Sequence, residues 1–338
     1  MLRLLLLCLT SWLFAAPALA ADPCPLLRTQ VASADTATRI AAYACKEHQN
    51  WFRPFIDADG RSGGLTVYEA ENGPLADGAE AWRKVATYWI ESGLLGSVYG
   101  RSGASECAYA PTARYVSPAC RTFVIDTPWS GAFVSWVMRR AGLPGFRASA
   151  SHIDYVREAY RNPARSPYLV QAPQSAKPAP GDLLCSVRNA SRLFGFGDLA
   201  TLLSVADSGG LAMHCDIVVG AGPGGLAYLV GGNVQNAVTL RMLKLDANGY
   251  FASLPSRTLA DLACSPDMPA NCDSNRQDWA VMLKLRPAVD LARLAPPPPV
   301  TAQGAQPQAP QRCVEVGGGM QVCSSPASTP AEPAQTSP

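Results

Sequence analysis

The sequence predicts an α+β fold in which a buried helix packs on an antiparallel sheet, after an N-terminal helical extension. Residues 22–105 are mainly helical in pattern, and residues 111–288 change to one helix followed by short strands. Beyond residue 294 the chain is rich in Pro, Ala, Gln and Ser, a composition that cannot bury a core. We therefore expect a signal peptide (1–20), a helical extension (21–110), a sheet-containing domain (111–290) and a disordered tail (291–338).

The first segment has the features of a secretory signal peptide. Arg3 precedes a Leu-rich run that ends at Phe14, and small residues then lead to a cleavage position after Ala20. Cys8 lies inside the apolar run with no small residue just before it, so we do not expect a lipid anchor. No later stretch reaches the ~18 apolar residues that a membrane span needs. We expect an exported protein, periplasmic or secreted, that acts as a monomer without a membrane span.

Charge gives no reason to expect nucleic acid or an anionic membrane as a partner, because the formal net charge is only +2. Removing Cys8 from the eleven cysteines leaves ten, an even number that indicates disulfides in an exported chain. Zinc is a poor alternative because no Cys-x-x-Cys pair is present and the three histidines are scattered, so we expect no metal and no cofactor. Spacing suggests the pairs Cys24–Cys45, Cys107–Cys120, Cys264–Cys272 and Cys313–Cys323, and leaves Cys185 and Cys215 for a cross-strand bridge, although spacing does not fix connectivity.

The helical extension contains two expected helices, at 26–46 and 80–94. In the second helix, Trp82, Val85 and Trp89 recur at helical spacing. In the tail, residues 313–323 place two β-prone arms around three glycines, which predicts a small disulfide-closed hairpin.

The central helix of the second domain is expected to begin near Thr127. Thr127 suits the N-cap, and Pro128 suits the first helical position, where its missing N–H costs nothing. Ser130 then lies in the first turn, where free backbone N–H groups favour negative charge. Trp136 belongs to a broad apolar face that we expect to be core.

Strands are expected at 181–187, 215–220 and 225–230, with a turn at 221–225 and a long glycine-containing insertion at 188–213. His152 stands at a second helix start. Because successive residues of a strand point to opposite faces, Cys215 points away from the face that His214 shares with Asp216.

Three residues have the order and spacing of a nucleophile, a base and an orienting amide: Ser130, His214 and Asn233. A serine hydroxyl does not ionise at neutral pH, so it needs a base that accepts its proton during attack. His214 begins a strand after a flexible loop and suits this task, and Asn233 could fix its tautomer. We take Trp129, His152 and Asp216 as candidate substrate contacts.

Each of these residues also has a structural explanation. Ser130 could bond backbone N–H groups at a helix start, His214 could be a buried histidine held under a loop, and Asn233 follows two glycines and could serve a turn. His152 could equally cap a helix or lie at the surface.

Four motifs carry a resemblance to known families. The runs 128–137, 180–184, 214–220 and 231–233 resemble the uncharacterised bacterial domain family numbered 2272 over roughly residues 40–285. They more distantly resemble the CHAP amidases of the papain-like clan over roughly residues 120–240.

The CHAP resemblance implies a papain-like fold and cleavage of peptidoglycan amide bonds by cysteine and histidine with a polar third residue. By motif, the nucleophile position falls on Ser130, where the CHAP enzymes carry cysteine, the base on His214 and the orienting residue on Asn233. We expect an amidase or endopeptidase acting on peptidoglycan or another cell-envelope substrate. The alternatives are an inactive peptidoglycan-binding protein that has lost the thiol, and a serine esterase.

Overall fold

The computed structural model describes residues 22–188, 191–205, 210–222, 224–251, 253–258, 264–294, 312–316 and 320–324. The predicted signal peptide and most of the predicted tail lie outside these residues. Residues up to Ala295 form one unit, and the segment from Pro296 forms a second unit that is described by itself. None of the helices in the described part has the length and apolar character that crossing a bilayer requires.

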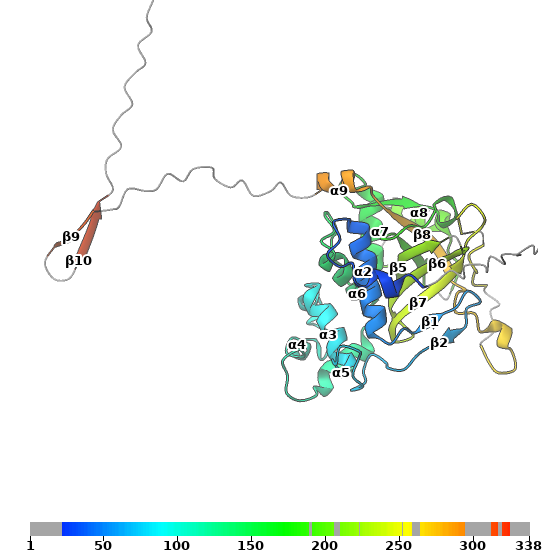
Figure 1. Cartoon of the computed structure of the whole chain (residues 1–338), viewed down its shortest axis with the longest axis horizontal. Helices are drawn as coiled ribbons and strands as arrows, with labels where there is room; N and C mark the ends of the chain where they lie inside the picture. Colours follow the sequence, from blue (N-terminus) through cyan, green and yellow to red (C-terminus); the bar gives the residue numbers. More distant parts are fainter. Residues whose placement is uncertain are drawn as a thin grey trace, which may run out of the picture. The chain divides into compact units, whose positions relative to one another are not determined.

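An eight-stranded sheet organises the first unit, with strand order β2-β1-β7-β6-β5-β4-β8-β3 (Figure 1). Neighbouring strands are antiparallel except β1 and β7, which run parallel. The predicted α+β class is confirmed, and the sheet is mixed rather than purely antiparallel. The strands are β1 (Phe55–Ile56), β2 (Ser62–Gly63), β3 (Tyr168–Gln171), β4 (Leu183–Val187), β5 (Met213–Gly222), β6 (Leu226–Val234), β7 (Ala237–Lys244) and β8 (Asp278–Leu285).

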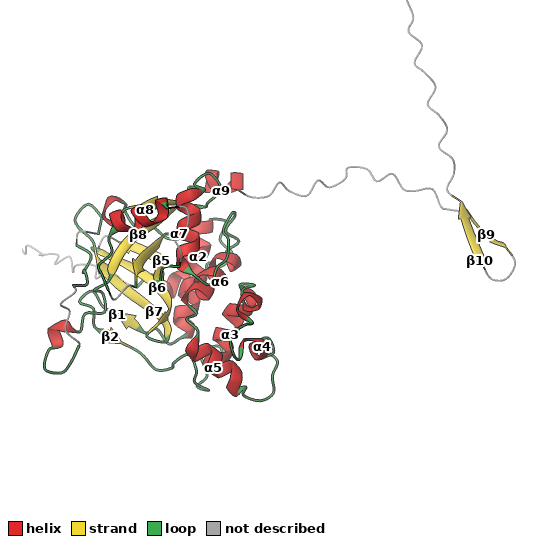
Figure 2. Ribbon diagram, turned by 180° about the vertical axis from the view of Figure 1, so that it is seen from behind, coloured by secondary structure: helices red, strands yellow, loops and turns green. Residues whose placement is uncertain are grey.

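Most helices lie to one side of the strands (Figure 2). Helix α6 packs on β5 and β6 and α2 packs on β5, β6 and β7, so these two helices cover the middle of the sheet. The helices are α1 (Cys24–Leu27), α2 (Thr36–Asn50), α3 (Ala81–Glu91), α4 (Ala104–Cys107), α5 (Pro118–Asp126), α6 (Ser130–Arg140), α7 (His152–Arg161), α8 (Phe196–Ser204) and α9 (Ala288–Leu294), with short 3-10 turns at Leu95–Val98, Pro173–Ser175 and Pro269–Asn271.

The prediction of one helix over 26–46 is wrong, because the structure has two helices there. The side chain of Asp35 accepts a hydrogen bond from Thr38 N at 2.8 Å and caps a new start at Thr36. The helix expected at 80–94 is confirmed as α3, with Trp82 and Trp89 buried.

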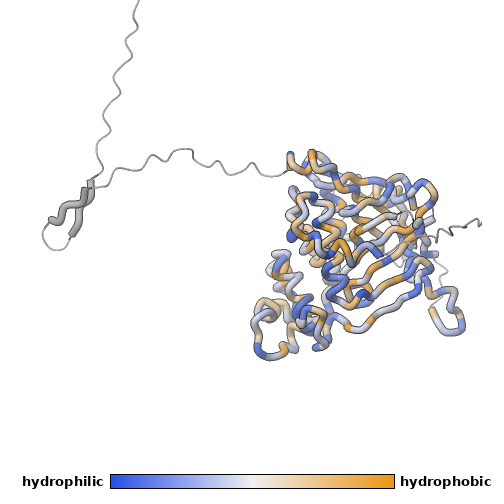
Figure 3. Tube along the Cα trace, in the orientation of Figure 1, coloured by the Kyte–Doolittle hydropathy of each residue, from blue (hydrophilic) through white to orange (hydrophobic). Residues whose placement is uncertain are grey.

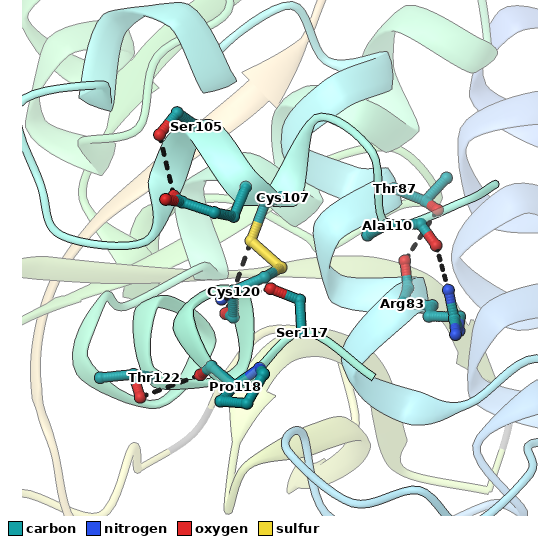
Figure 4. The surroundings of a disulfide bond; sticks show 10 residues. Arg83, Thr87, Ser105, Cys107, Ala110, Ser117, Pro118, Cys120 and Thr122 are labelled. Carbon is teal, nitrogen blue, oxygen red and sulfur yellow. Dashed lines mark hydrogen bonds between the residues drawn. A yellow bond between two sulfur atoms is a disulfide. The ribbon is translucent and has the colours of Figure 1, made fainter. Parts of the chain in front are cut away.

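The N-terminal segment shares the core of the sheet-containing segment. Strands β1 and β2 extend the sheet beyond β7, and α3 packs against α6. The Cys107–Cys120 disulfide joins α4 to α5 across the expected boundary at residue 110, and Figure 4 shows it beside the bond from Arg83 to the carbonyl of Ala110. These contacts place both segments in the same folding unit.

Apolar side chains pack on both faces of the sheet. The larger cluster lies under the helices and includes Trp136, which confirms its predicted core position. A smaller cluster on the other strand face includes Val218, Leu229 and Phe251. Figure 3 shows hydrophobic stretches along the central strands.

Four of the suggested disulfides are present, at Cys24–Cys45, Cys107–Cys120, Cys185–Cys215 and Cys264–Cys272. Cys185 and Cys215 lie directly opposite each other on β4 and β5, as the predicted neighbouring strands require. In the second unit, β9 (Arg312–Val316) and β10 (Met320–Ser324) form the predicted antiparallel hairpin. The suggested Cys313–Cys323 bridge concerns side chains outside the described part of the chain.

Candidate active site

Helix α6 begins at Ser130, two residues after the predicted first helical position. Thr127 is instead the C-cap of α5, where its N–H donates to Phe123 O at 3.0 Å, and Trp129 is the residue before α6. The predicted roles of Thr127 as N-cap and Pro128 as first residue are therefore wrong. Ser130 nevertheless lies in the first turn, where the backbone N–H groups of a helix have no partner within the helix.

Ser130 is hydrogen-bonded to His152, the first residue of α7. The distance between Ser130 Oγ and His152 Nε2 is 2.7 Å, and the two residues are 5% and 3% exposed. Gly131 allows this approach of the two helix starts, because a Cβ there would overlap the carbonyl oxygen of Ala150. A glycine in the motif after Ser130 thus has a direct role in forming the pair.

The imidazole of His152 is held in a neutral state. Burial lowers its pKa well below the ordinary value, and the neighbouring His214 and Arg188 lower it further. His152 Nδ1 is bonded to the hydroxyl of Tyr155, whose pKa is raised by burial, so that hydroxyl is also neutral. His152 accepts the proton of Ser130 on Nε2 only in the tautomer that carries its proton on Nδ1 and donates it to the Tyr155 oxygen.

A second histidine pair lies on the sheet. His214 Nε2 bonds to Asp216 Oδ1 at 2.7 Å, and Arg241 Nε donates to Asp216 Oδ2 at 2.9 Å. Burial alone would raise the pKa of Asp216, but His214 and Arg241 lower it by more, so the carboxylate is ionised. Burial lowers the pKa of His214 despite this carboxylate.

The two histidines are in contact. Their ring centroids are 5.3 Å apart, with the rings at 62° to each other. The predicted pair of Ser130 and His214 is therefore brought into one cluster, but His152 is the histidine that is bonded to the serine. Asp216, predicted as a substrate contact, is 1% exposed and orients His214.

Asn233 lies near the end of β6 with a left-handed backbone, at φ 57°. In the amide orientation that satisfies both groups, its nitrogen donates to Glu69 Oε2 at 3.1 Å and its oxygen accepts from Trp129 N at 3.0 Å. Asn233 therefore fixes the residue before Ser130, and the tautomer of His214 is set by Asp216.

Trp129 lies in the aromatic core rather than along a cleft. It has no exposed surface and stacks on Trp51 and Tyr88, with ring centroids 5.8 and 5.6 Å away. Its Nε1 donates to Glu69 Oε2 at 2.6 Å, and burial raises the pKa of this glutamate. The start of α6 is thus anchored by both Trp129 and Asn233.

A cavity of about 200 Å³ borders this cluster. It reaches His214, Asp216 and Asn233, but Ser130 and His152 do not line it. A larger cavity of about 650 Å³ lies among α2, α3 and α6 and contains none of the predicted site residues. The smaller one is therefore the relevant space, because it contacts His214.

Several residues of the site were not predicted from the sequence: Tyr155, Glu69, Arg188 and Arg241. The sequence feature that best indicates a close contact in this site is the Gly231-Gly232 pair. A side chain at Gly231 would overlap Asp216. Across the described residues, no group of three or more His, Cys, Asp or Glu side chains is placed to hold a metal ion.

Residues 76–285 match the family described as "Uncharacterized protein conserved in bacteria (DUF2272)", which is more than half of the chain. The chain therefore belongs to this family, as its motifs predicted. No curated protein and no solved structure gave a match.

Proposed function

We propose that this protein is an exported serine hydrolase that cleaves amide bonds in the peptides of peptidoglycan. The observation that supports the chemistry best is the 2.7 Å hydrogen bond between Ser130 Oγ and His152 Nε2. A serine nucleophile needs a neutral base within this distance, and the lowered pKa of His152 keeps the imidazole neutral at pH 7.

In the proposed reaction, Ser130 Oγ attacks the amide carbonyl carbon while its proton passes to His152 Nε2. The backbone N–H groups at the start of α6 stabilise the oxyanion. When the C–N bond breaks, His152 returns the proton to the leaving amine, and an acyl ester remains on Ser130. Water then attacks the ester, gives a proton to His152, and releases the acid as Ser130 regains its hydrogen.

His214 has one of two roles in this proposal. Packed against His152 and paired with Asp216, it positions the first histidine, or it takes the proton from Ser130 itself after His152 moves aside, which was the expectation from the sequence. The two roles differ in a measurable way, because only the first makes His152 indispensable.

Burial of the cluster favours a second candidate, an inactive wall-binding protein. Ser130, His152 and His214 are 5%, 3% and 4% exposed, and Ser130 does not line the cavity. This candidate binds peptidoglycan without turnover, whereas the hydrolase requires the start of α7 to open.

The test is release of soluble fragments from purified peptidoglycan by the mature protein. We expect wild type to release fragments, and Ser130→Ala and His152→Gln to release none. Cleavage by Ser130→Cys alone would support the inactive binder. Full activity of His152→Gln together with loss of activity in His214→Gln would assign the base to His214. No fragment release by any form of the protein would reject peptidoglycan as the substrate.

A further inference from the structure

The cavity beside His214 carries an uncompensated positive charge. Its charged lining residues are Arg188, Asp216 and Arg241, and the last two form an ion pair at 2.9 Å. The guanidinium of Arg188 has no hydrogen bond or ion pair with any residue that the structure describes. An anionic group in this cavity would complement that charge.

The same cavity also contains two buried acceptors without partners among the described residues, His214 Nδ1 and Gln235 Oε1. Because the neutral His214 donates its Nε2–H to Asp216, its Nδ1 carries a lone pair. The amide nitrogen of Gln235 is bonded to Ser62, which leaves its oxygen as the acceptor. Leaving a buried acceptor without a partner is unfavourable, so a ligand that supplies N–H donors is favoured.

The ligand must therefore combine a negative charge with N–H groups. A carboxyl-terminal peptide end has both, since the terminal carboxylate stands next to a backbone amide N–H. The volume of about 200 Å³ is below the roughly 300–1,000 Å³ of sites that enclose a whole small molecule. It suits the end of a longer chain.

We propose that this cavity binds the carboxyl-terminal end of a peptide, with the carboxylate on Arg188 and amide N–H groups on His214 Nδ1 and Gln235 Oε1. The inference rests on the proposed function and deepens it, because it names the part of the substrate that lies beside His214. It assigns Arg188 as a specificity-determining residue.

The test is calorimetric titration of the intact protein with N-acetyl-alanyl-alanine and with its C-terminal amide, which differ in the terminal charge. We expect the acid to bind at least about tenfold more tightly than the amide. Arg188→Gln should abolish this preference. Arg114→Gln is the matched control, because Arg114 is also exposed but does not line the cavity.

Equal affinity for the two probes, or no binding of either, would overturn the inference, as would a preference that survives in Arg188→Gln. Binding of these probes does not require turnover. If the protein prefers the acid but releases no peptidoglycan fragments, the peptide-binding inference stands and the proposed hydrolysis is rejected. If it releases fragments without preferring the acid, the hydrolysis stands and the peptide-binding inference is rejected.

Discussion

Replacing Asp216 by asparagine removes the buried negative charge that is bonded to His214 and Arg241. Asp216 is 1% exposed and Arg241 is 5% exposed, so the variant leaves the arginine buried with neutral acceptors such as Asn275 Oδ1 at 2.8 Å. Removing one partner of a buried ion pair costs roughly 3–5 kcal/mol. Since typical unfolding free energies are about 5–15 kcal/mol, we expect Asp216→Asn to be strongly destabilised.

The loss of stability in Asp216→Asn should depend on pH in a definite direction. The pKa of Asp216 is lower in the folded protein than in the unfolded chain, so its ionisation stabilises the fold above about pH 4. That contribution declines as the pH falls below this value. The difference in unfolding free energy between wild type and Asp216→Asn should therefore shrink in the same range.

Denaturant unfolding followed by circular dichroism from neutral to acidic pH measures both effects. Asp59→Asn is the control, because Asp59 forms an exposed ion pair with Lys244 at 2.7 Å, and such pairs contribute little. Unfolding of Asp216→Asn at the same denaturant concentration as wild type, or an equal destabilisation of Asp59→Asn, would contradict this prediction.

Two further predictions concern packing and protonation. Gly131→Ala should push the start of α6 away from Ala150 and lower both stability and fragment release. The control is Gly197→Ala in α8, which has open space around it and should unfold like wild type. Equal effects of the two substitutions would count against a close contact between Gly131 and Ala150. Burial lowers the pKa of His48 to about 4, so stability should fall as the pH drops from about 6.5 toward 4, where the unfolded chain binds the proton first. In unfolding experiments His48→Gln should show a shallower slope in that range, and an unchanged slope would exclude His48 as its source.

Local patterns predicted the elements that depend on local forces. The alternation on β5 correctly separated Cys215 from His214, because successive strand residues point to opposite faces. The helical spacing of Trp82, Val85 and Trp89 likewise predicted α3, whose side chains are buried as expected.

Two predictions about helices and loops were wrong. The helix expected over 26–46 is interrupted because Asp35 caps a new start, which apolar spacing alone does not reveal. Residues 188–213 were expected to be a loop, but Phe196–Ser204 forms α8, where Leu199 and Leu203 are buried.

The partner of Ser130 also depends on tertiary structure. His214 was chosen because its order and spacing fit a base, whereas His152 bonds the serine because Gly131 lets α6 approach Ala150. Arg241 lies on β7, 25 residues after Asp216 on β5, and β6 separates the two strands, so their pairing follows from the sheet topology rather than from any local motif.

The most direct test of the proposed nucleophile and base is covalent labelling of the protein without residues 1–20 by a small fluorophosphonate, followed by peptide mapping. Attack by Ser130 Oγ on phosphorus expels fluoride and leaves a mass label on that residue. We predict a label on Ser130 that is suppressed in His152→Gln, and none on the buried Ser135, whose hydroxyl donates to Ser149 O. Absence of the label from Ser130, or labelling that is equally fast in His152→Gln, would contradict the proposal that these two residues form the nucleophile and base.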